Sequence, residues 1–239
     1  TGANVFPQRI DVPVGASQPL EIASIAVIDD GTEETRGNGD GVPNPGERIG
    51  LRFGLVNATQ EDLPAHAAAL FPDAAQQGAA FPPGEIEVPA LGPRGSAVLE
   101  SPFLYEVPVN AGDGYAPRFY LRISREGAPA QVSETTVSVA APSILHVGHD
   151  LGGLPLDPGA AVEVACELRN EGSLAANAVS AVLRSLDPGV AAVEDSSTAY
   201  GTIPPGGSAY GEEAFVVRAA AGAVAGQSAG FKLILTTEE

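Results

Sequence analysis

The sequence predicts an all-β fold, and three observations lead to that prediction. Apolar and polar residues alternate along short segments, for example through Ile49, Leu51, Phe53 and Leu55, which is the period of a strand with one buried face. The chain holds 29 glycines and 21 prolines, residues that break helices and form turns. The most helix-like stretch, Ala219–Ala225, is short and interrupted by glycine, so we expect a loop there.

The chain begins with a proline-containing arm, which we assign to residues 1–20. Within it Ile10, Val12 and Val14 alternate like a strand. Pro13 lacks a backbone donor and limits this stretch to a sheet edge or to an unpaired position. Two interpretations stay open: a leader or the tail of a preceding domain, and a strand donated to a neighbouring subunit. The absence of Met, even at position 1, leads us to expect a processed, trimmed or fragmentary chain.

Further strands are expected at regular intervals after the arm, each bounded by turn residues. The predicted strands are Ile22–Ile28, Ile49–Asn57, His66–Phe71, Glu85–Leu91, Phe103–Val107, Arg118–Ser124 and Val132–Val139. Strand signals at such a spacing are typical of a two-sheet antiparallel sandwich. A parallel sheet would instead show continuous apolar runs separated by helical segments.

The second half of the chain repeats the first. The Asn-Pro-Gly triplet at 44–46 returns as Asp-Pro-Gly at 157–159, and the alternating strand that follows returns in the same register. After one deletion the correspondence continues, and it pairs Phe103 with Phe215, Phe119 with Phe231 and Leu121 with Leu233. An ordered set of matches at nearly constant spacing indicates an internal repeat. We therefore place two domains at 21–140 and 141–239, joined near Ala140-Ala141-Pro142.

The polar loop ahead of the strand Ile49–Asn57 fits a calcium-binding loop. In a twelve-residue EF-hand-type loop, oxygen ligands occupy positions 1, 3, 5, 7, 9 and 12, and glycine occupies position 6. With Gly41 at position 6, positions 3 to 12 provide Asn38, Asp40, the Val42 carbonyl, Asn44 and Glu47. Position 1 is Arg36, which cannot bind a cation. The missing carboxylate would have to come from Asp29, Asp30 or Glu34.

We therefore predict a structural calcium site in this loop. Its ligands are expected to be Asp30, Asn38, Asp40, Val42, Asn44 and Glu47. Calcium is preferred over magnesium because all these ligands are oxygens on a flexible loop. The loop is also longer than its counterpart in the second half, and the added residues are those that carry its acidic, Asn and Gly content. The alternative is a solvated loop whose Asn and Gly residues serve left-handed backbone positions.

Composition argues against several classes of function. The formal net charge of −18 repels nucleic acid backbones and anionic lipid. No apolar run approaches the roughly 20 residues of a membrane-spanning helix. The single cysteine, Cys166, cannot form an intramolecular disulfide. No phosphate-binding loop occurs. We expect no nucleic acid partner, no membrane insertion and no enzyme activity.

Two weaker motifs have structural explanations. The His-x-x-His motif at 146–149 and Cys166 are zinc ligands by type, but Cys166 aligns with Phe53 on the apolar face, where a buried hydrophobic residue is expected. Asn57 begins an Asn-x-Thr sequon, whereas Asn170 holds the same repeat position without one. We therefore expect Asn57 to serve the turn at the end of its strand.

The motif as a whole resembles a known type of module. The series Asn-Gly-Asp-Gly-x-x-Asn-Pro-Gly-Glu at 38–47, the alternating strand to Asn57 and a turn with Pro, Gly and Ser are similar to immunoglobulin-like (Ig-like) modules of secreted and surface bacterial proteins, of the CARDB-like and adhesion type. The second half departs from the pattern at Leu156 and Ala160. The resemblance implies tandem Ig-like antiparallel β-sandwich domains with a spacer, stalk, adhesive or accessory role, and no catalysis.

These observations lead to ranked functional expectations. The first is a non-catalytic structural protein, extracellular or on the cell surface, whose partners are copies of itself or other surface proteins. A surface filament or surface-layer homopolymer assembled through the N-terminal arm is one form of it. The alternative is an accessory or spacer module of a larger secreted hydrolase or surface protein. A ligand-binding adhesin ranks third. Adhesins that bind sugars usually display exposed aromatic residues, and among the tyrosines Tyr115 and Tyr210 lie nearest to predicted loops.

Overall fold

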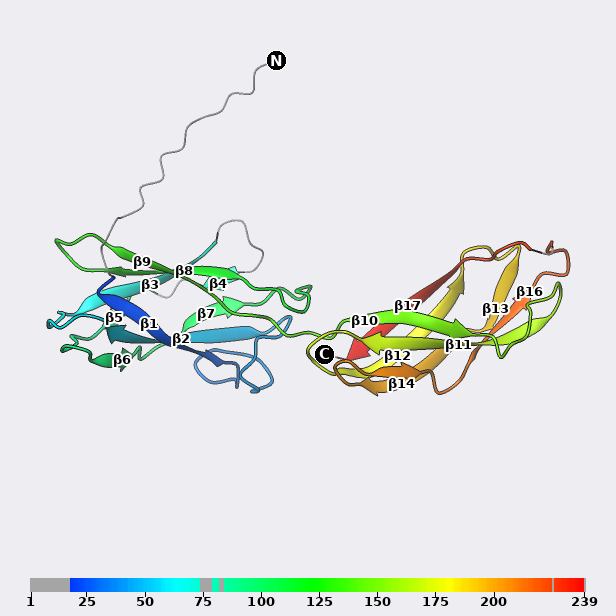
Figure 1. Cartoon of the computed structure of the whole chain (residues 1–239), viewed down its shortest axis with the longest axis horizontal. Helices are drawn as coiled ribbons and strands as arrows, with labels where there is room; N and C mark the ends of the chain where they lie inside the picture. The colour runs from blue at the N-terminus through cyan, green and yellow to red at the C-terminus, as the bar shows by residue number, and fades with distance from the viewer. Residues whose placement is uncertain (1–17, 74–78, 82–83, 225, 239) are drawn as a thin grey trace, which may run out of the picture.

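The computed structural model describes residues 18–73, 79–81, 84–224 and 226–238, and over them the chain forms strands and loops without a helix (Figure 1). The predicted all-β fold is confirmed. In this part of the chain, no helix long and apolar enough to cross a membrane is present. The predicted strand-like stretch Ile10–Val14 of the arm lies outside the described residues.

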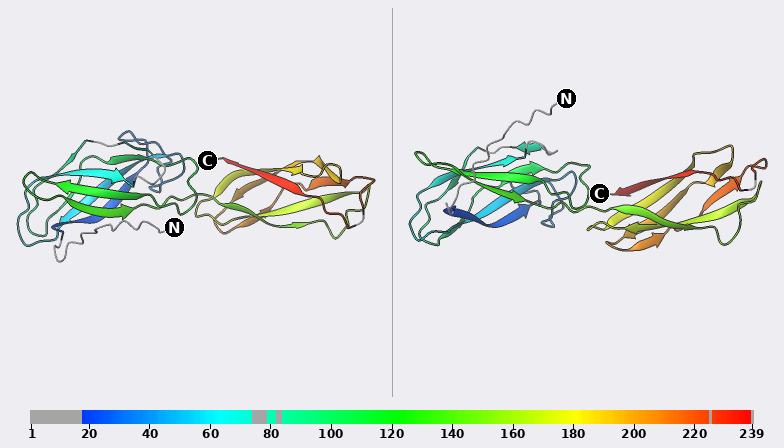
Figure 2. Two further views of the ribbon diagram at one scale, coloured as in Figure 1. Left: turned by 90° about the horizontal axis from the view of Figure 1, so that it is seen from above. Right: turned by 45° about the horizontal axis from the view of Figure 1, so that its top comes forward.

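Strands β1 to β9 form two antiparallel sheets, which together we call the first unit. One sheet has the order β1-β2-β7-β4, with β6 also paired to β2, and the other has the order β5-β3-β8-β9. The strands are β1 (Leu20–Ile28), β2 (Arg48–Asn57), β3 (His66–Pro72), β4 (Ala79–Phe81), β5 (Ile86–Val88), β6 (Ser96–Val98), β7 (Phe103–Glu106), β8 (Arg118–Ser124) and β9 (Gln131–Thr136). The two sheets lie as facing layers (Figure 2).

Strands β10 to β17 form the second unit in the same way. One sheet has the order β10-β11-β16-β13, with β15 also paired to β11, and the other has the order β14-β12-β17. The strands are β10 (Ile144–Asp150), β11 (Ala161–Asn170), β12 (Ala176–Ser185), β13 (Ala191–Asp195), β14 (Ser197–Ile203), β15 (Ser208–Tyr210), β16 (Phe215–Ala219) and β17 (Phe231–Glu238). Among the described residues, no strand of one unit pairs with a strand of the other.

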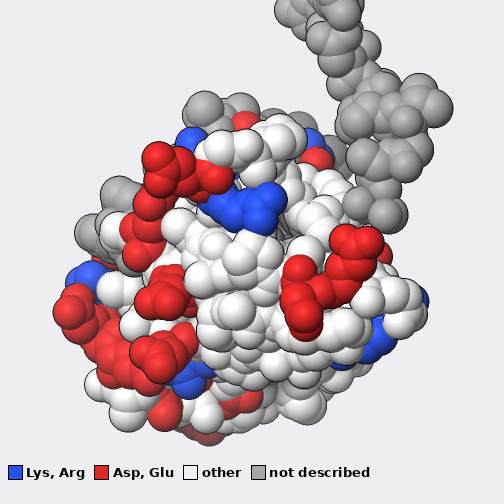
Figure 3. All heavy atoms as spheres, turned by 90° about the vertical axis from the view of Figure 1, so that its left-hand side faces the viewer, with Lys and Arg blue, Asp and Glu red and all other residues white. Residues whose placement is uncertain are grey.

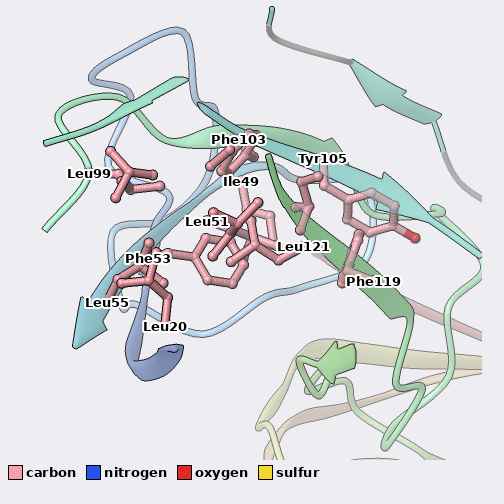
Figure 4. Packing of buried hydrophobic residues seen from close by; sticks show 14 of the residues in the cluster. Leu20, Ile49, Leu51, Phe53, Leu55, Leu99, Phe103, Tyr105, Phe119 and Leu121 are labelled. Carbon is pink, nitrogen blue, oxygen red and sulfur yellow. The ribbon is translucent and has the colours of Figure 1, made fainter. Parts of the chain in front are cut away.

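The core of the first unit lies between its two sheets (Figure 4). The four alternating apolar residues of β2 are fully buried, as their spacing predicts. The rings of Phe53 and Phe103 meet edge to face with centroids 5.8 Å apart, and those of Tyr105 and Phe119 do so at 5.0 Å. Such pairs contribute about 0.5–1.5 kcal/mol beyond the area they bury. Burial also raises the pKa of the Tyr105 hydroxyl well above its usual value.

The predicted strands agree best where the alternation is strongest. The strand Arg118–Ser124 has the predicted bounds, and β2 and β3 each differ from theirs by one residue. The expected strand Glu85–Leu91 is shortened to β5, because Pro89 follows directly and cannot donate to a ladder. The last expected strand, Val132–Val139, ends early at Thr136.

The internal repeat is visible in the hydrogen bonds. Asn57 ends β2 and donates its backbone N–H to the carbonyl of Gly95 at 2.8 Å, and Asn170 ends β11 and donates to Gly207 at 2.9 Å. Both glycines precede a short strand that pairs with the same long strand, β6 with β2 and β15 with β11. The motifs aligned by sequence therefore occupy equivalent places in the two units.

The segment that connects the units is buried and bonded to the first unit. Ala140 and Ala141 are 9% and 3% exposed. The N–H of Ala140 donates to the carbonyl of Pro43 at 2.9 Å, and the N–H of Ala141 donates to Oδ1 of Asp113 at 3.0 Å. The backbone of the connection is thus fixed against two loops of the first unit.

The same connection is also bonded to the second unit. The N–H of Ser143 donates to Oδ1 of Asn170 at 3.0 Å. Asp113 of the first unit accepts a hydrogen bond from the hydroxyl of Ser173 in the second. A Cβ atom at Gly172 would lie 2.2 Å from the carbonyl oxygen of Ala141, so glycine is required by this close approach. The junction is a packed contact rather than a free linker.

The surface carries the negative charge that the composition requires. Figure 3 views the end of the molecule that lies on the left in Figure 1, and it shows Asp and Glu side chains spread across that face with few Lys or Arg among them. No cluster of basic side chains is visible on this face.

Candidate metal centre

The predicted calcium loop connects β1 to β2 and is closed at its base by backbone pairing. Arg36 and Arg48 exchange two backbone hydrogen bonds, at 2.7 and 2.9 Å. The side chain of Arg36 lies 3.7 Å from the carboxylate of Glu106 on β7. The one residue of the calcium-loop register that cannot bind a cation therefore serves the base of the loop.

Glu47 is the centre of the loop. Its side chain is only 8% exposed. Oε1 accepts a hydrogen bond from the N–H of Asn38 at 3.0 Å, and Oε2 accepts one from the N–H of Asn44 at 2.9 Å. Burial raises the pKa of Glu47 above its usual value, although the two hydrogen bonds act to lower it. The charges of Asp29 and Asp40 raise the pKa further. The carboxylates of Asp29 and Asp40 are thus close enough to repel that of Glu47.

The other predicted ligands are linked to each other around Glu47. The amide Nδ2 of Asn38 donates to Oδ1 of Asn44 at 2.7 Å and to Oδ2 of Asp40 at 3.2 Å. Oδ1 of Asp40 accepts from the N–H of Val42 at 2.8 Å. Four of the six predicted ligands, Asn38, Asp40, Asn44 and Glu47, therefore lie in one hydrogen-bonded group with Val42 adjoining it.

The remaining predicted ligand, Asp30, lies beside Gly39 of the loop but directs its carboxylate to Thr32. It is exposed, and its Oδ1 accepts hydrogen bonds from the N–H of Thr32 at 3.0 Å and from the Thr32 hydroxyl at 2.6 Å. These bonds hold the pKa of Asp30 below its usual value. Asp29 is 2% exposed, and both its oxygens lie 3.2 Å from the N–H of Gly41. The structure thus turns Asp29, rather than Asp30, toward the loop.

The loop is packed so closely that glycine is needed at its start. A Cβ atom at Gly37 would lie 2.6 Å from the carbonyl oxygen of Asp29 and 2.7 Å from Oε1 of Glu47. Gly41, at the sixth position of the predicted calcium loop, has a φ of 76°, which favours glycine. These two glycines let the backbone turn tightly around the acidic side chains.

The oxygen-rich group fits the chemistry of calcium, with one adjustment. Asp29, Asp40 and Glu47 would supply carboxylate oxygens, and Asn44 an amide oxygen, which are ligands that calcium prefers. Asn38 directs its Nδ2 toward Asn44 and Asp40, so it would have to turn its Oδ1 to a bound cation. Within the described residues, no three His, Cys, Asp or Glu side chains are already arranged as a metal site.

The loop also contacts the junction between the units. Nδ2 of Asn44 donates to the carbonyl of Ala140 at 3.3 Å, and the neighbouring Pro43 accepts from the N–H of Ala140. Asn44 is only 8% exposed. The same loop that gathers the carboxylates therefore also holds the connecting segment.

The histidine motif of the second unit lies on a cavity wall. His146 and His149 have nearly parallel rings with centroids 5.8 Å apart. They and Cys166 line a cavity of about 540 Å³ whose other lining residues are mostly apolar. Cys166 is 6% exposed, and burial raises the pKa of its thiol. A zinc ligand would instead be a thiolate, so the expected role of a buried hydrophobic residue fits Cys166 better.

Asn57 has the turn role that the repeat predicts. Its side chain is fully buried, and Nδ2 lies within hydrogen-bonding distance of the carbonyl oxygens of Glu61, Leu91 and Gly92. Asn170 makes the equivalent bonds in the second unit, to Leu174 at 2.6 Å and Ile203 at 3.0 Å. A glycan on Nδ2 of Asn57 would displace these contacts, so the sequon does not mark a usable site in the folded chain.

Comparisons with known proteins show only distant likeness. No protein-family model matches the chain, and no curated protein sequence matches it. Among solved structures, it is similar to red sea bream transglutaminase (12% identity, TM-score 0.32, covering 93% of this chain and 29% of that one) and to the secreted serine protease VesC of Vibrio cholerae (13% identity, TM-score 0.29, covering 85% and 50%). A Salmonella alpha-2-macroglobulin mutant is 13% identical with a TM-score of 0.22, covering 82% and 14%. The chain spans half or less of each of these proteins.

Proposed function

We propose that the chain is a non-catalytic structural protein of the cell exterior, formed by two tandem Ig-like sandwiches that assemble into a polymer through the N-terminal arm. The observation that carries this proposal is the junction, where the connecting segment is buried and bonded to both units. A structural role needs units at a fixed relation to each other, and a packed junction provides it. The extracellular location rests on the motif resemblance.

The calcium site is part of the same proposal. We propose that Ca²⁺ binds Asp29, Asp40 and Glu47 together with the side-chain oxygens of Asn38 and Asn44. The carboxylates of Asp29 and Asp40 repel that of Glu47. A divalent cation would balance these negative charges. Because Asn44 also contacts Ala140, calcium would stiffen both the loop and the junction.

Thermal unfolding in calcium and in chelator tests this site. A ligand at about 100 times its Kd stabilises the folded state by about 2.7 kcal/mol, so we expect a clear rise in the midpoint with calcium. Glu47→Gln should abolish the rise. Glu126→Gln is the matched control, because Glu126 is exposed in the turn between β8 and β9. Equal midpoints with calcium and with chelator would count against the site.

Light scattering and negative-stain imaging of the full chain, with and without calcium, test the structural function itself. Regular polymers that are lost when residues 1–17 are deleted would support a filament or surface-layer subunit. Polymers that persist after this deletion would refute assembly through the arm. A monodisperse elongated monomer at all concentrations would instead favour the alternative, an accessory or spacer module of a larger secreted protein.

A further inference from the structure

Asn38 is the only asparagine of the chain that is followed by glycine. The backbone nitrogen after an asparagine can attack the side-chain carbonyl carbon, because this closes a five-membered ring between groups already held in one chain segment. A glycine at the second position has no side chain to crowd that ring. Asn44 precedes a proline, which has no N–H, and the other asparagines precede larger residues. Asn38 and Gly39 are thus the pair best suited to this reaction.

The backbone nitrogen that would attack is free in the folded chain. Within the described residues, no acceptor is bonded to the N–H of Gly39, and Gly39 is exposed. An added Cβ at Gly39 would come no closer than 3.7 Å to Asp30 among these residues, so the site is uncrowded. The next glycine of the loop differs, because the N–H of Gly41 faces both carboxylate oxygens of Asp29 at 3.2 Å. The Gly39 nitrogen can therefore react without first losing a hydrogen bond.

The side-chain carbonyl of Asn38 is polarised toward attack. Its Oδ1 accepts a hydrogen bond from the N–H of Asp40 at 2.9 Å. When a nitrogen adds to Cγ, negative charge develops on Oδ1, and a donor already directed at that oxygen stabilises the charge. Asn38 is exposed, so water reaches it. The loop thus combines an accessible nucleophile, an activated carbonyl and the water that a later hydrolysis needs.

We propose that Asn38 is a site of spontaneous deamidation through a cyclic imide with Gly39. The nitrogen of Gly39 loses its proton to water and bonds to Cγ of Asn38, while Nδ2 takes a proton from water and leaves as ammonia. Water then opens the imide at one of its two carbonyl carbons. Opening at Cγ leaves aspartate at position 38, and opening at the other carbonyl leaves isoaspartate, whose main chain runs through the side chain. In both products a carboxylate replaces the amide.

Deamidation changes the hydrogen bonds of the loop. Nδ2 of Asn38 donates to Oδ1 of Asn44 at 2.7 Å and to Oδ2 of Asp40 at 3.2 Å. A carboxylate at position 38 donates neither bond, and it faces the carboxylate of Asp40 and the amide oxygen of Asn44 instead. Like charges so close together repel. Without calcium, the loop should therefore lose stability when the amide is lost.

The same change improves the loop as a calcium site. This consequence rests on the proposed calcium site, whereas the deamidation itself does not. An amide at position 38 directs its Nδ2 toward Asn44 and Asp40, and it must turn before its oxygen can bind a cation. A carboxylate carries oxygen on both sides and adds a negative charge, and the charge of the ligands tunes calcium affinity. Deamidation therefore replaces a loop held by its own amide with a loop held by calcium.

Peptide mapping by mass spectrometry tests the modification on the full chain, incubated folded at mildly alkaline pH. Asn110 and Asn177 are internal references, because both are exposed and precede alanine. We expect Asn38 to deamidate at least several-fold faster than either reference, with aspartate and isoaspartate both found at position 38. Deamidation of Asn38 no faster than the references would overturn the inference. Deamidation of Asn38 in denaturant alone would also overturn it, because the folded loop would then protect the amide.

Thermal unfolding of the Asn38→Asp chain tests the consequence for the loop. We expect a lower midpoint than that of the native chain in chelator, and a larger rise with calcium. The matched control is Asn177→Asp, which adds the same charge on β12 and should leave the rise unchanged. An equal rise in the native and Asn38→Asp chains would refute the effect on calcium binding. Fast deamidation with no calcium response in either chain would refute the calcium site and leave the modification standing. A calcium response without deamidation would do the reverse.

Discussion

The side chain of Asn57 holds the turn after β2, and its removal has a magnitude that follows from the contacts. Nδ2 donates to the carbonyls of Glu61 and Gly92 at 2.7 and 2.9 Å, and Oδ1 accepts from the N–H and hydroxyl of Thr59 at 2.8 and 2.7 Å. Each bond contributes on the order of 0.5–1.5 kcal/mol. Thr59 is partly exposed and can bond to water, so we expect Asn57→Ala to cost about 2–3 kcal/mol.

Thermal unfolding followed by circular dichroism measures this cost. For a unit of about 100 residues, 2–3 kcal/mol lowers the midpoint by roughly 8–15 °C. The control is Asn177→Ala, an exposed residue of β12 whose replacement should change stability by less than about 0.5 kcal/mol. Asn170→Ala should reproduce the effect in the second unit. A cost for Asn57→Ala within error of the Asn177→Ala cost would refute the structural role that we assign to this side chain.

Three further predictions concern the junction, the loop and the cysteine. Asp113→Ala should broaden the distribution of shapes measured by X-ray scattering, because Asp113 bonds both to Ala141 and to Ser173; the exposed Asp195→Ala should not, and equal broadening would contradict the packed junction. Glu47 has a raised pKa, so without calcium its contribution to stability should be full below its usual pKa of 4.5 and should be lost as pH rises through the raised value. Glu47→Gln should remove that dependence, and an unchanged stability profile against pH would disprove it. Cys166, buried with a raised pKa, should react with a thiol reagent much more slowly in the folded chain than in denaturant, and similar rates would contradict the burial of this thiol.

The alternating pattern predicts the strands well because burial of one face determines it. The alternating apolar residues of β2 are fully buried, and β8 has its predicted bounds. The sequence alignment of the two repeats was also predictive, because Asn57 and Asn170, which it pairs, make the same turn contacts. The length of β5 was less predictable, because pairing with β3 extends only to Val88 before Pro89 interrupts it.

In the loop between β1 and β2, the spacing of residues predicts some of the candidate ligands but not all of them. Asn38, Asp40, Asn44 and Glu47 gather as their spacing predicts. Whether Asp29 or Asp30 points toward the other ligands depends on the direction of the backbone where it leaves β1. The ligand spacing of an EF-hand-type loop does not predict that direction. Asp29, the first residue after β1, is buried, whereas Asp30 turns outward to Thr32.

Negative-stain imaging of the full chain, compared at equal concentration with a chain that lacks residues 1–17, tests the central claim most directly. The predicted result is regular polymers of the full chain and monomers of the shortened chain. Polymers of both chains, or of neither, would contradict the account.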